Sequence, residues 1–154
     1  MLWEPERMEM VDLPLRPLRK GEVLLKVEAC SICGSDLEGL HGWHPKMTYP
    51  RVMGHEAAST VAEVGPGVTT LSVGDRVAGV GKGPCGACPA CREGRVDDCQ
   101  APGGLGFGAH GAYAEYMISS TDDLTLIPDG VTFVQAAVAQ PAGIARHAVA
   151  TRAA

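Results

Sequence analysis

The sequence predicts a mainly β fold, arranged as a partly open barrel, with a metal-binding lobe and a C-terminal helical segment. Short stretches of alternating apolar and polar residues recur between glycine turns. Four of the six cysteines lie within residues 85–99, and the pattern changes to that of helices after residue 130. With 154 residues, 20 glycines and 5% aromatic residues, the chain suits one domain with an aliphatic core.

Five stretches predict strands, because each has period-two alternation and is bounded by turn residues. In the first stretch, which follows Gly21, the side chains of Val23, Leu25 and Val27 share one face. The second stretch ends at the turn Gly65-Pro66-Gly67. The predicted strands lie within residues 21–30, 60–68, 74–80, 112–118 and 124–128.

The C-terminal part of the chain predicts two helices. Thr132 and Gln135 have the spacing of a capping box ahead of an apolar run, and Pro141 is expected as the first residue of a second helix. That helix would continue to residue 154. We therefore expect the chain to be part of a longer protein.

Charge and hydropathy argue against polyanion and membrane partners. The net charge is -5 and the 13 basic residues are scattered, so no nucleic-acid partner is expected. The N-terminus lacks the apolar segment of a signal peptide, and no apolar run approaches the roughly 18 residues of a membrane span. The sequence predicts a cytoplasmic protein without a membrane partner.

Residues 106–111, GFGAHG, match the dinucleotide-binding pattern G-x-G-x-x-G. In that motif the glycines join a buried strand to a helix whose N-terminal amides meet the pyrophosphate. Here a turn-rich segment precedes the glycines and a predicted strand follows them. We interpret these glycines as a loop that leads into a strand.

The segment GPCGACPACREGRVDDC places Cys85, Cys88, Cys91 and Cys99 at the spacing C-x2-C-x2-C-x7-C. Four thiolates in a compact loop favour a closed structural zinc site. Disulfides are the first alternative, and the absence of a signal peptide disfavours them. An iron–sulfur cluster is the second alternative, but the fourth cysteine of the ferredoxin pattern follows after three residues and precedes proline.

A second set of candidate ligands is dispersed over CSICGSD (30–36) and GHE (54–56). Cys33, His55 and Glu56 would form a three-ligand zinc site with an open position for water or substrate. The alternative is that Cys33 is a small core residue and that His55 and Glu56 are a surface pair. Cys30 is expected to be a buried strand residue.

These motifs together resemble the zinc-dependent medium-chain alcohol and polyol dehydrogenases. The resemblance covers nearly the whole chain, in the same order: CGSD, GHE, VGPGV, GDRV, the four-cysteine loop, GAYAEY and QPAGIARHAV. In that family a GroES-like catalytic domain precedes a Rossmann domain that binds NAD or NADP. The resemblance implies a GroES-like domain over 1–130 with a zinc lobe at about 82–102, and a helical segment over 131–154 leading into the second domain.

The resemblance also implies roles for single residues. Cys33, His55 and Glu56 would hold a catalytic zinc, and Ser35 would relay the substrate proton. Cys85, Cys88, Cys91 and Cys99 would hold a structural zinc. The substrate would be a small alcohol or polyol, and the full-length enzyme would be a homo-oligomer.

Three positions depart from the family pattern. Glu38 replaces a histidine that continues the proton relay in many relatives, and Ser59 replaces a glycine, so a different local turn is expected there. Gln140 replaces a glutamate beside the metal. Zn²⁺ with Cys33, Glu56 and neutral His55 has zero net charge, so we expect a more Lewis-acidic but more weakly held zinc.

Two functions are consistent with the sequence. The chain is either the catalytic part of a dehydrogenase or a zinc-stabilised binding or structural module that has lost the enzyme. The residues provide no nicotinamide pocket, so the isolated chain is expected to be inactive.

Overall fold

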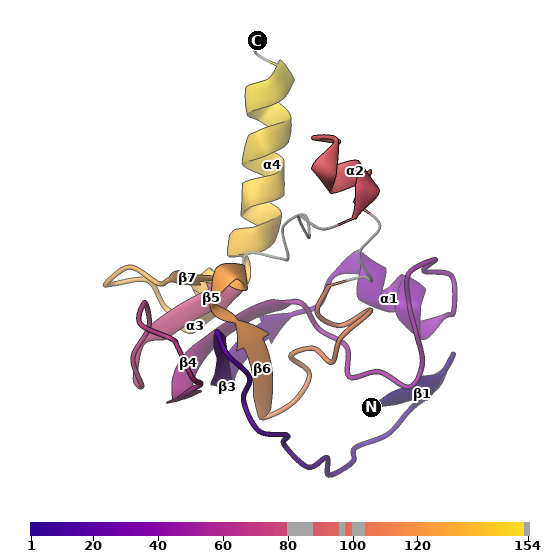
Figure 1. Cartoon of the computed structure of the whole chain (residues 1–154). Coiled ribbons are helices and arrows are strands. Elements are labelled where there is room, and N and C mark those ends of the chain that lie inside the picture. Colours follow the sequence, from indigo (N-terminus) through magenta and orange to yellow (C-terminus); the bar gives the residue numbers. More distant parts are fainter. Residues whose placement is uncertain (80–87, 96–97, 100–103, 153–154) are drawn as a thin grey trace.

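The computed structural model describes residues 1–79, 88–95, 98–99 and 104–152 (Figure 1). The strands are β1 (Leu2–Glu4), β2 (Arg7–Met8), β3 (Glu22–Ser31), β4 (Glu56–Val64), β5 (Arg76–Gly79), β6 (Tyr116–Ser120) and β7 (Leu124–Leu126). The helices are α1 (Gly34–Leu40), α2 (Pro89–Arg92), α3 (Phe133–Ala137) and α4 (Ala139–Arg152), with a 3-10 turn, η2, at Thr121–Asp123.

One five-stranded antiparallel sheet organises the molecule, in the order β6-β3-β4-β5-β7. The long strands β3 and β4 lie at its centre, with Val23 opposite Val64 and Ser31 opposite Glu56. The edge strands β6 and β7 do not pair with each other in the described part of the chain. The mainly β prediction is therefore confirmed, and the sheet forms no closed barrel.

The two faces of the sheet bury different clusters, because successive strand residues point to opposite sides. On one face Val23 and Leu25 of β3 pack with Val61, Val77 and Met117. On the other face the small side chains of Ala58 and Ala78 leave room for α3, which contributes Ala136 and Ala137. Hence β4 and β5 are covered on both sides.

The five predicted strands are present, with shifted boundaries and one omission: the strand predicted within 60–68 begins already at Glu56 and ends at Val64. Strand β6 begins at Tyr116 and not at 112, because the N–H groups of Ala112 and Tyr113 donate to the carbonyls of Gly54 and Met53 at 2.9 and 2.8 Å. The hairpin of β1 and β2 was not predicted. Its core residue, Leu2, is buried and pairs with Arg51.

The capping box of α3 is confirmed. The Gln135 N–H donates to Thr132 Oγ1 at 3.2 Å, and the Thr132 N–H donates to Gln135 Oε1 at 2.9 Å. The prediction for Pro141 is wrong, because α4 begins at Ala139. Proline at the third helical position costs no helical hydrogen bond, since the first N–H groups have no partner within the helix.

Helix α4 extends away from the sheet (Figure 1). No helix in the described part of the chain is long and apolar enough to cross a membrane.

Candidate metal centre

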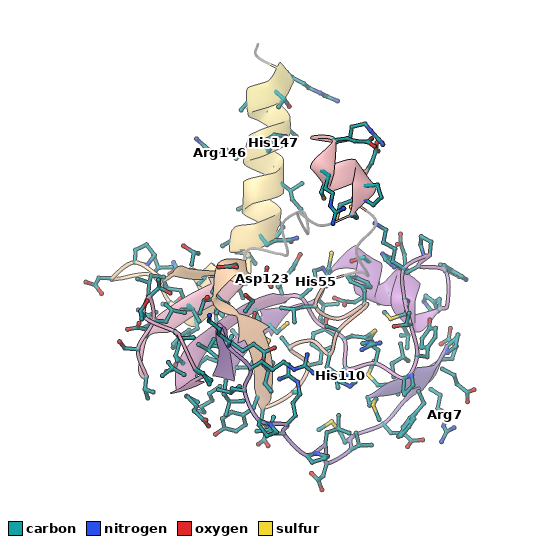
Figure 2. All side chains as sticks on the ribbon, viewed as in Figure 1. Arg7, His55, His110, Asp123, Arg146 and His147 are labelled. Carbon is teal, nitrogen blue, oxygen red and sulfur yellow. The ribbon has the colours of Figure 1, made fainter. Side chains whose placement is uncertain are left out.

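The antiparallel pairing of β3 and β4 brings the dispersed candidate ligands together. Cys33 follows β3 as the N-cap of α1, and Glu56 is the first residue of β4, directly after His55. The end of β3 therefore meets the start of β4, and one ligand atom from each of the three residues lies within 4.8 Å of the other two. Figure 2 shows His55 beside α1.

The donor atoms of this cluster are withdrawn from solvent. The His55 side chain is 13% exposed, Glu56 is 5% exposed and Cys33 is half-buried. The Ser31 hydroxyl donates to Glu56 Oε2, which fixes the orientation of the carboxylate. The reading of His55 and Glu56 as a surface pair is therefore excluded.

Asp36 forms a second layer behind the cluster. It is 2% exposed, and its Oδ2 accepts hydrogen bonds from the Cys33 N–H at 3.0 Å and the Tyr113 hydroxyl at 2.8 Å. Burial by itself would raise the pKa of Asp36, but the nearby His55 imidazole and the hydrogen bonds from the Cys33 N–H and the Tyr113 hydroxyl together lower it. Asp36 is therefore a carboxylate at neutral pH.

The Asp36 carboxylate faces His55. Its Oδ1 lies 3.5 Å from His55 Nδ1, which is within ion-pair range and long for a hydrogen bond. Neither atom has a hydrogen-bond partner among the described residues. Asp36, and secondarily Cys33, raise the pKa of His55 against the effect of burial. With Nδ1 directed at a carboxylate, Nε2 is the nitrogen left for a metal.

The glycines of GFGAHG support the loop that carries His55. A Cβ on Gly111 would lie 2.7 Å from the Met53 carbonyl oxygen and closer still to that of Gly54. A Cβ on Gly106, whose φ is +80°, would lie 3.0 Å from the Gly54 nitrogen. Between these glycines, the Phe107 ring centroid lies 5.0 Å from that of His55. The segment is a packing loop, and residues 112–115 separate it from β6.

The cysteine loop forms the second cluster. Cys88 is the N-cap of α2, Cys91 lies within α2, and the sulfurs of Cys88, Cys91 and Cys99 lie within 4.8 Å of one another. Cys85, the fourth predicted ligand, lies outside the described residues. Three thiol groups at this separation match the soft donor set that zinc prefers.

Three further residues, Ser35, Cys30 and His110, have separate positions. Ser35 is the second residue of α1 and is half-buried, two positions after Cys33. Cys30 is half-buried in β3, and burial raises its pKa to about 11, so it is a thiol at neutral pH. His110, which Figure 2 shows apart from His55, accepts a hydrogen bond from the Val52 N–H at 3.1 Å.

Sequence reasoning missed Asp36 as a partner of His55, and it missed Ser31, Phe107 and Tyr113. The local signal for Asp36 was its spacing three residues after Cys33, which is that of a helix cap. The other three contacts are made between segments far apart in the chain and leave no local signal.

Comparisons with known proteins agree with this geometry. Residues 19–129 match the family model of the alcohol dehydrogenase GroES-like domain. An alcohol dehydrogenase of Geobacillus stearothermophilus is 37% identical over 147 residues, which are 94% of this chain and 43% of that protein.

Two solved structures share the fold. Acetophenone reductase from Geotrichum candidum in complex with NAD is 38% identical with a TM-score of 0.76, covering 88% of this chain and 41% of that one. The cobalt and zinc bound thermostable alcohol dehydrogenase from Pyrobaculum aerophilum is 30% identical with a TM-score of 0.69, covering 82% and 38%. The chain thus spans less than half the length of these relatives. From the matched residues and the shared fold, we conclude that the chain belongs to the alcohol dehydrogenase GroES-like domain family.

Proposed function

We propose that this chain is the catalytic-domain portion of a zinc-dependent alcohol or polyol dehydrogenase. The longer protein would oxidise a small alcohol to a carbonyl compound and transfer the hydride to NAD or NADP. The observation that carries the proposal is the convergence of Cys33, His55 and Glu56 to within 4.8 Å at the junction of β3 and β4.

The donor set of this cluster fits zinc. A thiolate sulfur, an imidazole nitrogen and a carboxylate oxygen are the ligand types of catalytic zinc sites, which keep a fourth position for water or substrate. The buried pair of His55 Nδ1 and Asp36 Oδ1 is the outer-layer arrangement typical of a histidine that ligates a metal. A zinc ion bound there would polarise a substrate oxygen and ease the loss of its proton.

The residues of the chain have distinct tasks in this proposal. Cys33, His55 and Glu56 bind the metal, and Ser31 and Asp36 orient two of these ligands. Ser35, in the first turn of α1, would accept the substrate proton and pass it on. The half-buried position of the site limits access of water to the reacting group.

The second cluster would hold a structural zinc through Cys88, Cys91 and Cys99, with Cys85 as the fourth ligand. A site of four thiolates has no open position, so its task would be to keep the lobe at about 82–102 folded. Two zinc ions per chain are therefore proposed, one catalytic and one structural.

The remaining parts of the enzyme would lie in the longer protein. The acetophenone reductase relative contains NAD, and this chain matches less than half of it. We accordingly propose that 1–130 is the catalytic domain, that 131–154 leads into a nicotinamide-binding domain, and that the full-length enzyme is a homo-oligomer. The alternative, a zinc-stabilised structural module without catalysis, does not require an open metal site.

Elemental analysis of metal per chain distinguishes the two functions. We expect two zinc ions in the wild type and one in Cys33→Ala. Cys30→Ala is the matched control: it removes a neighbouring half-buried cysteine that is outside the cluster, and it should retain two zinc ions. One zinc ion in all three proteins would contradict the catalytic site and support the structural module.

A further inference from the structure

Tyr113 connects the two loops that build the proposed catalytic site. It lies between the GFGAHG loop and β6, 58 positions after His55 in the sequence. Its half-buried side chain reaches the α1 side of the site, where its hydroxyl donates to Asp36 Oδ2 at 2.8 Å. The motif GAYAEY, which contains Tyr113, did not predict any role for this residue.

The backbone and the ring of Tyr113 are attached to the loop that carries His55. Its N–H donates to the Met53 carbonyl at 2.8 Å. A Cβ on Gly54 would lie 2.6 Å from Tyr113 Cδ1, so only a glycine leaves space for the ring at this position. Tyr113 therefore has little freedom to move relative to His55.

The hydroxyl is one of two donors that orient the Asp36 carboxylate toward His55. Oδ2 accepts from two donors, the Tyr113 hydroxyl and the Cys33 N–H. Two donors on one oxygen hold the carboxylate against rotation, and Oδ1 is left 3.5 Å from His55 Nδ1. The carboxylate is thus held in place by contacts other than the one with the imidazole.

We propose that Tyr113 is a positioning residue for the metal ligand His55, acting through the Asp36 carboxylate. The inference rests on the proposed function, because it takes His55 to be a ligand. A fixed carboxylate holds the imidazole with Nε2 directed at the metal, so less freedom is lost when the metal binds. The hydroxyl contributes to metal affinity without touching the metal.

The test is a titration with Co²⁺ in competition with a chromophoric chelator, combined with the visible spectrum of the bound Co²⁺. Tyr113→Phe removes one oxygen and keeps the ring on Gly54. We expect a 3- to 10-fold weaker affinity of the open site, less than the ~10- to 100-fold typical of groups bonded directly to a ligand. The d–d bands of that site, identified by their absence in Cys33→Ala, should also shift.

Two controls accompany this measurement. Tyr116→Phe, at an exposed position of β6, makes the same chemical change away from the site and should leave the open site unchanged. The four-cysteine lobe of the same molecule should keep its affinity in Tyr113→Phe. A loss shared equally by the lobe would indicate a global effect and would overturn the proposal.

A double-mutant cycle shows whether Tyr113 acts through Asp36. On an Asp36→Asn background, Tyr113→Phe should cause little further loss of affinity. Equal losses on both backgrounds, or an unchanged affinity and spectrum in the single Tyr113→Phe variant, would overturn the proposal. Failure of the proposed function looks different: the wild type itself would then take up Co²⁺ only in the lobe.

Discussion

At the residue scale, Ser59 carries a buried hydroxyl group within the sheet. It is 1% exposed, and its Oγ has no hydrogen-bond partner among the described residues. The prediction of a different local turn at Ser59 is wrong, because Ser59 lies within β4, opposite Val27 and Val77. A buried hydroxyl that has lost its bonds to water destabilises the folded state.

Ser59→Ala should therefore stabilise the protein by about 1 kcal/mol, since it removes the unpaired group and hardly changes the volume. Urea unfolding at constant zinc content measures this difference. Ser119→Ala is the matched control, because Ser119 is also buried and its hydroxyl donates to the Ser120 carbonyl at 3.4 Å. A lower free energy of unfolding in Ser59→Ala would show that the hydroxyl has a partner.

Also at the residue scale, Glu22 contributes a pH-dependent stabilisation. Its carboxylate accepts hydrogen bonds from both terminal nitrogens of Arg16, at 2.7 and 2.8 Å, and from the Arg19 N–H at 2.8 Å. The Arg16 guanidinium, with help from that N–H and against the effect of burial, lowers the pKa of Glu22 from 4.5 to about 2. The folded state therefore binds the Glu22 proton less well than the unfolded state does.

It follows that this stabilisation is complete above pH 4.5 and is lost as the pH falls toward 2. Solvent screens the pair, so we expect Glu22→Gln to lower the free energy of unfolding by about 1 kcal/mol at pH 6 and by almost nothing near pH 2. Urea unfolding of both proteins at each pH measures the difference. Metal loss in acid should affect the wild type and Glu22→Gln equally. If the two proteins differ in free energy of unfolding by the same amount at both pH values, the Arg16–Glu22 pair is not the source of the pH dependence.

At the scale of elements, the GFGAHG loop can pack against the His55 loop only because Gly106 and Gly111 have no side chains. Gly111→Ala would place a methyl group against the backbone carbonyls of Met53 and Gly54, which cannot move without displacing His55. We expect a loss of about 3 kcal/mol in the free energy of unfolding, together with weaker zinc binding at the open site.

Gly143→Ala is the control for this prediction. Gly143 lies within α4, and a Cβ there would meet no other atom within 4 Å. The same change should stabilise the helix by up to about 1 kcal/mol. Thermal unfolding and metal analysis of both variants check the pair, and equal effects would show that the close approach to Gly54 is not the cause.

At the scale of the whole molecule, α4 has an unburied apolar surface. The helical C-terminal segment carries the apolar residues Ala136, Ala137, Val138, Ile144, Ala145, Ala148 and Val149. The first two are buried against the sheet, while Ile144 is 61% and Val149 is 72% exposed. No residue of α4 within Ala139–Arg152 is buried.

We expect the chain of 154 residues to self-associate through this surface at high concentration. The double variant Ile144→Lys with Val149→Lys should sediment as a monomer where the wild type does not. Val73→Lys, at a similarly exposed valine outside α4, should not change the association. A wild-type sedimentation coefficient independent of concentration would contradict the prediction.

The sequence by itself determined the five strands of the main sheet, the α3 cap and the chemical types of the candidate ligands. Strand alternation and the Thr132 and Gln135 cap depend on neighbours within a few residues, so they are visible in one segment. The cysteine spacing is local in the same way. The pairing of Cys33 with His55 and Glu56 was predicted through the family resemblance, since spacing alone left a surface pair as an alternative.

Only the tertiary structure decided how the site is supported. Asp36 contacts Tyr113, which is 77 positions later in the sequence, and Gly54 contacts Gly111, which is 57 positions later. Both contacts form because the loops after β3, before β4 and before β6 pack together at one end of the sheet. The same docking keeps Ala112 and Tyr113 out of β6, because their N–H groups donate to the carbonyls of Gly54 and Met53. A bridge between Leu2 and Arg51 attaches the unpredicted β1 to a distant part of the chain. Such contacts depend on the packing of the whole chain, and no local pattern of side chains encodes them.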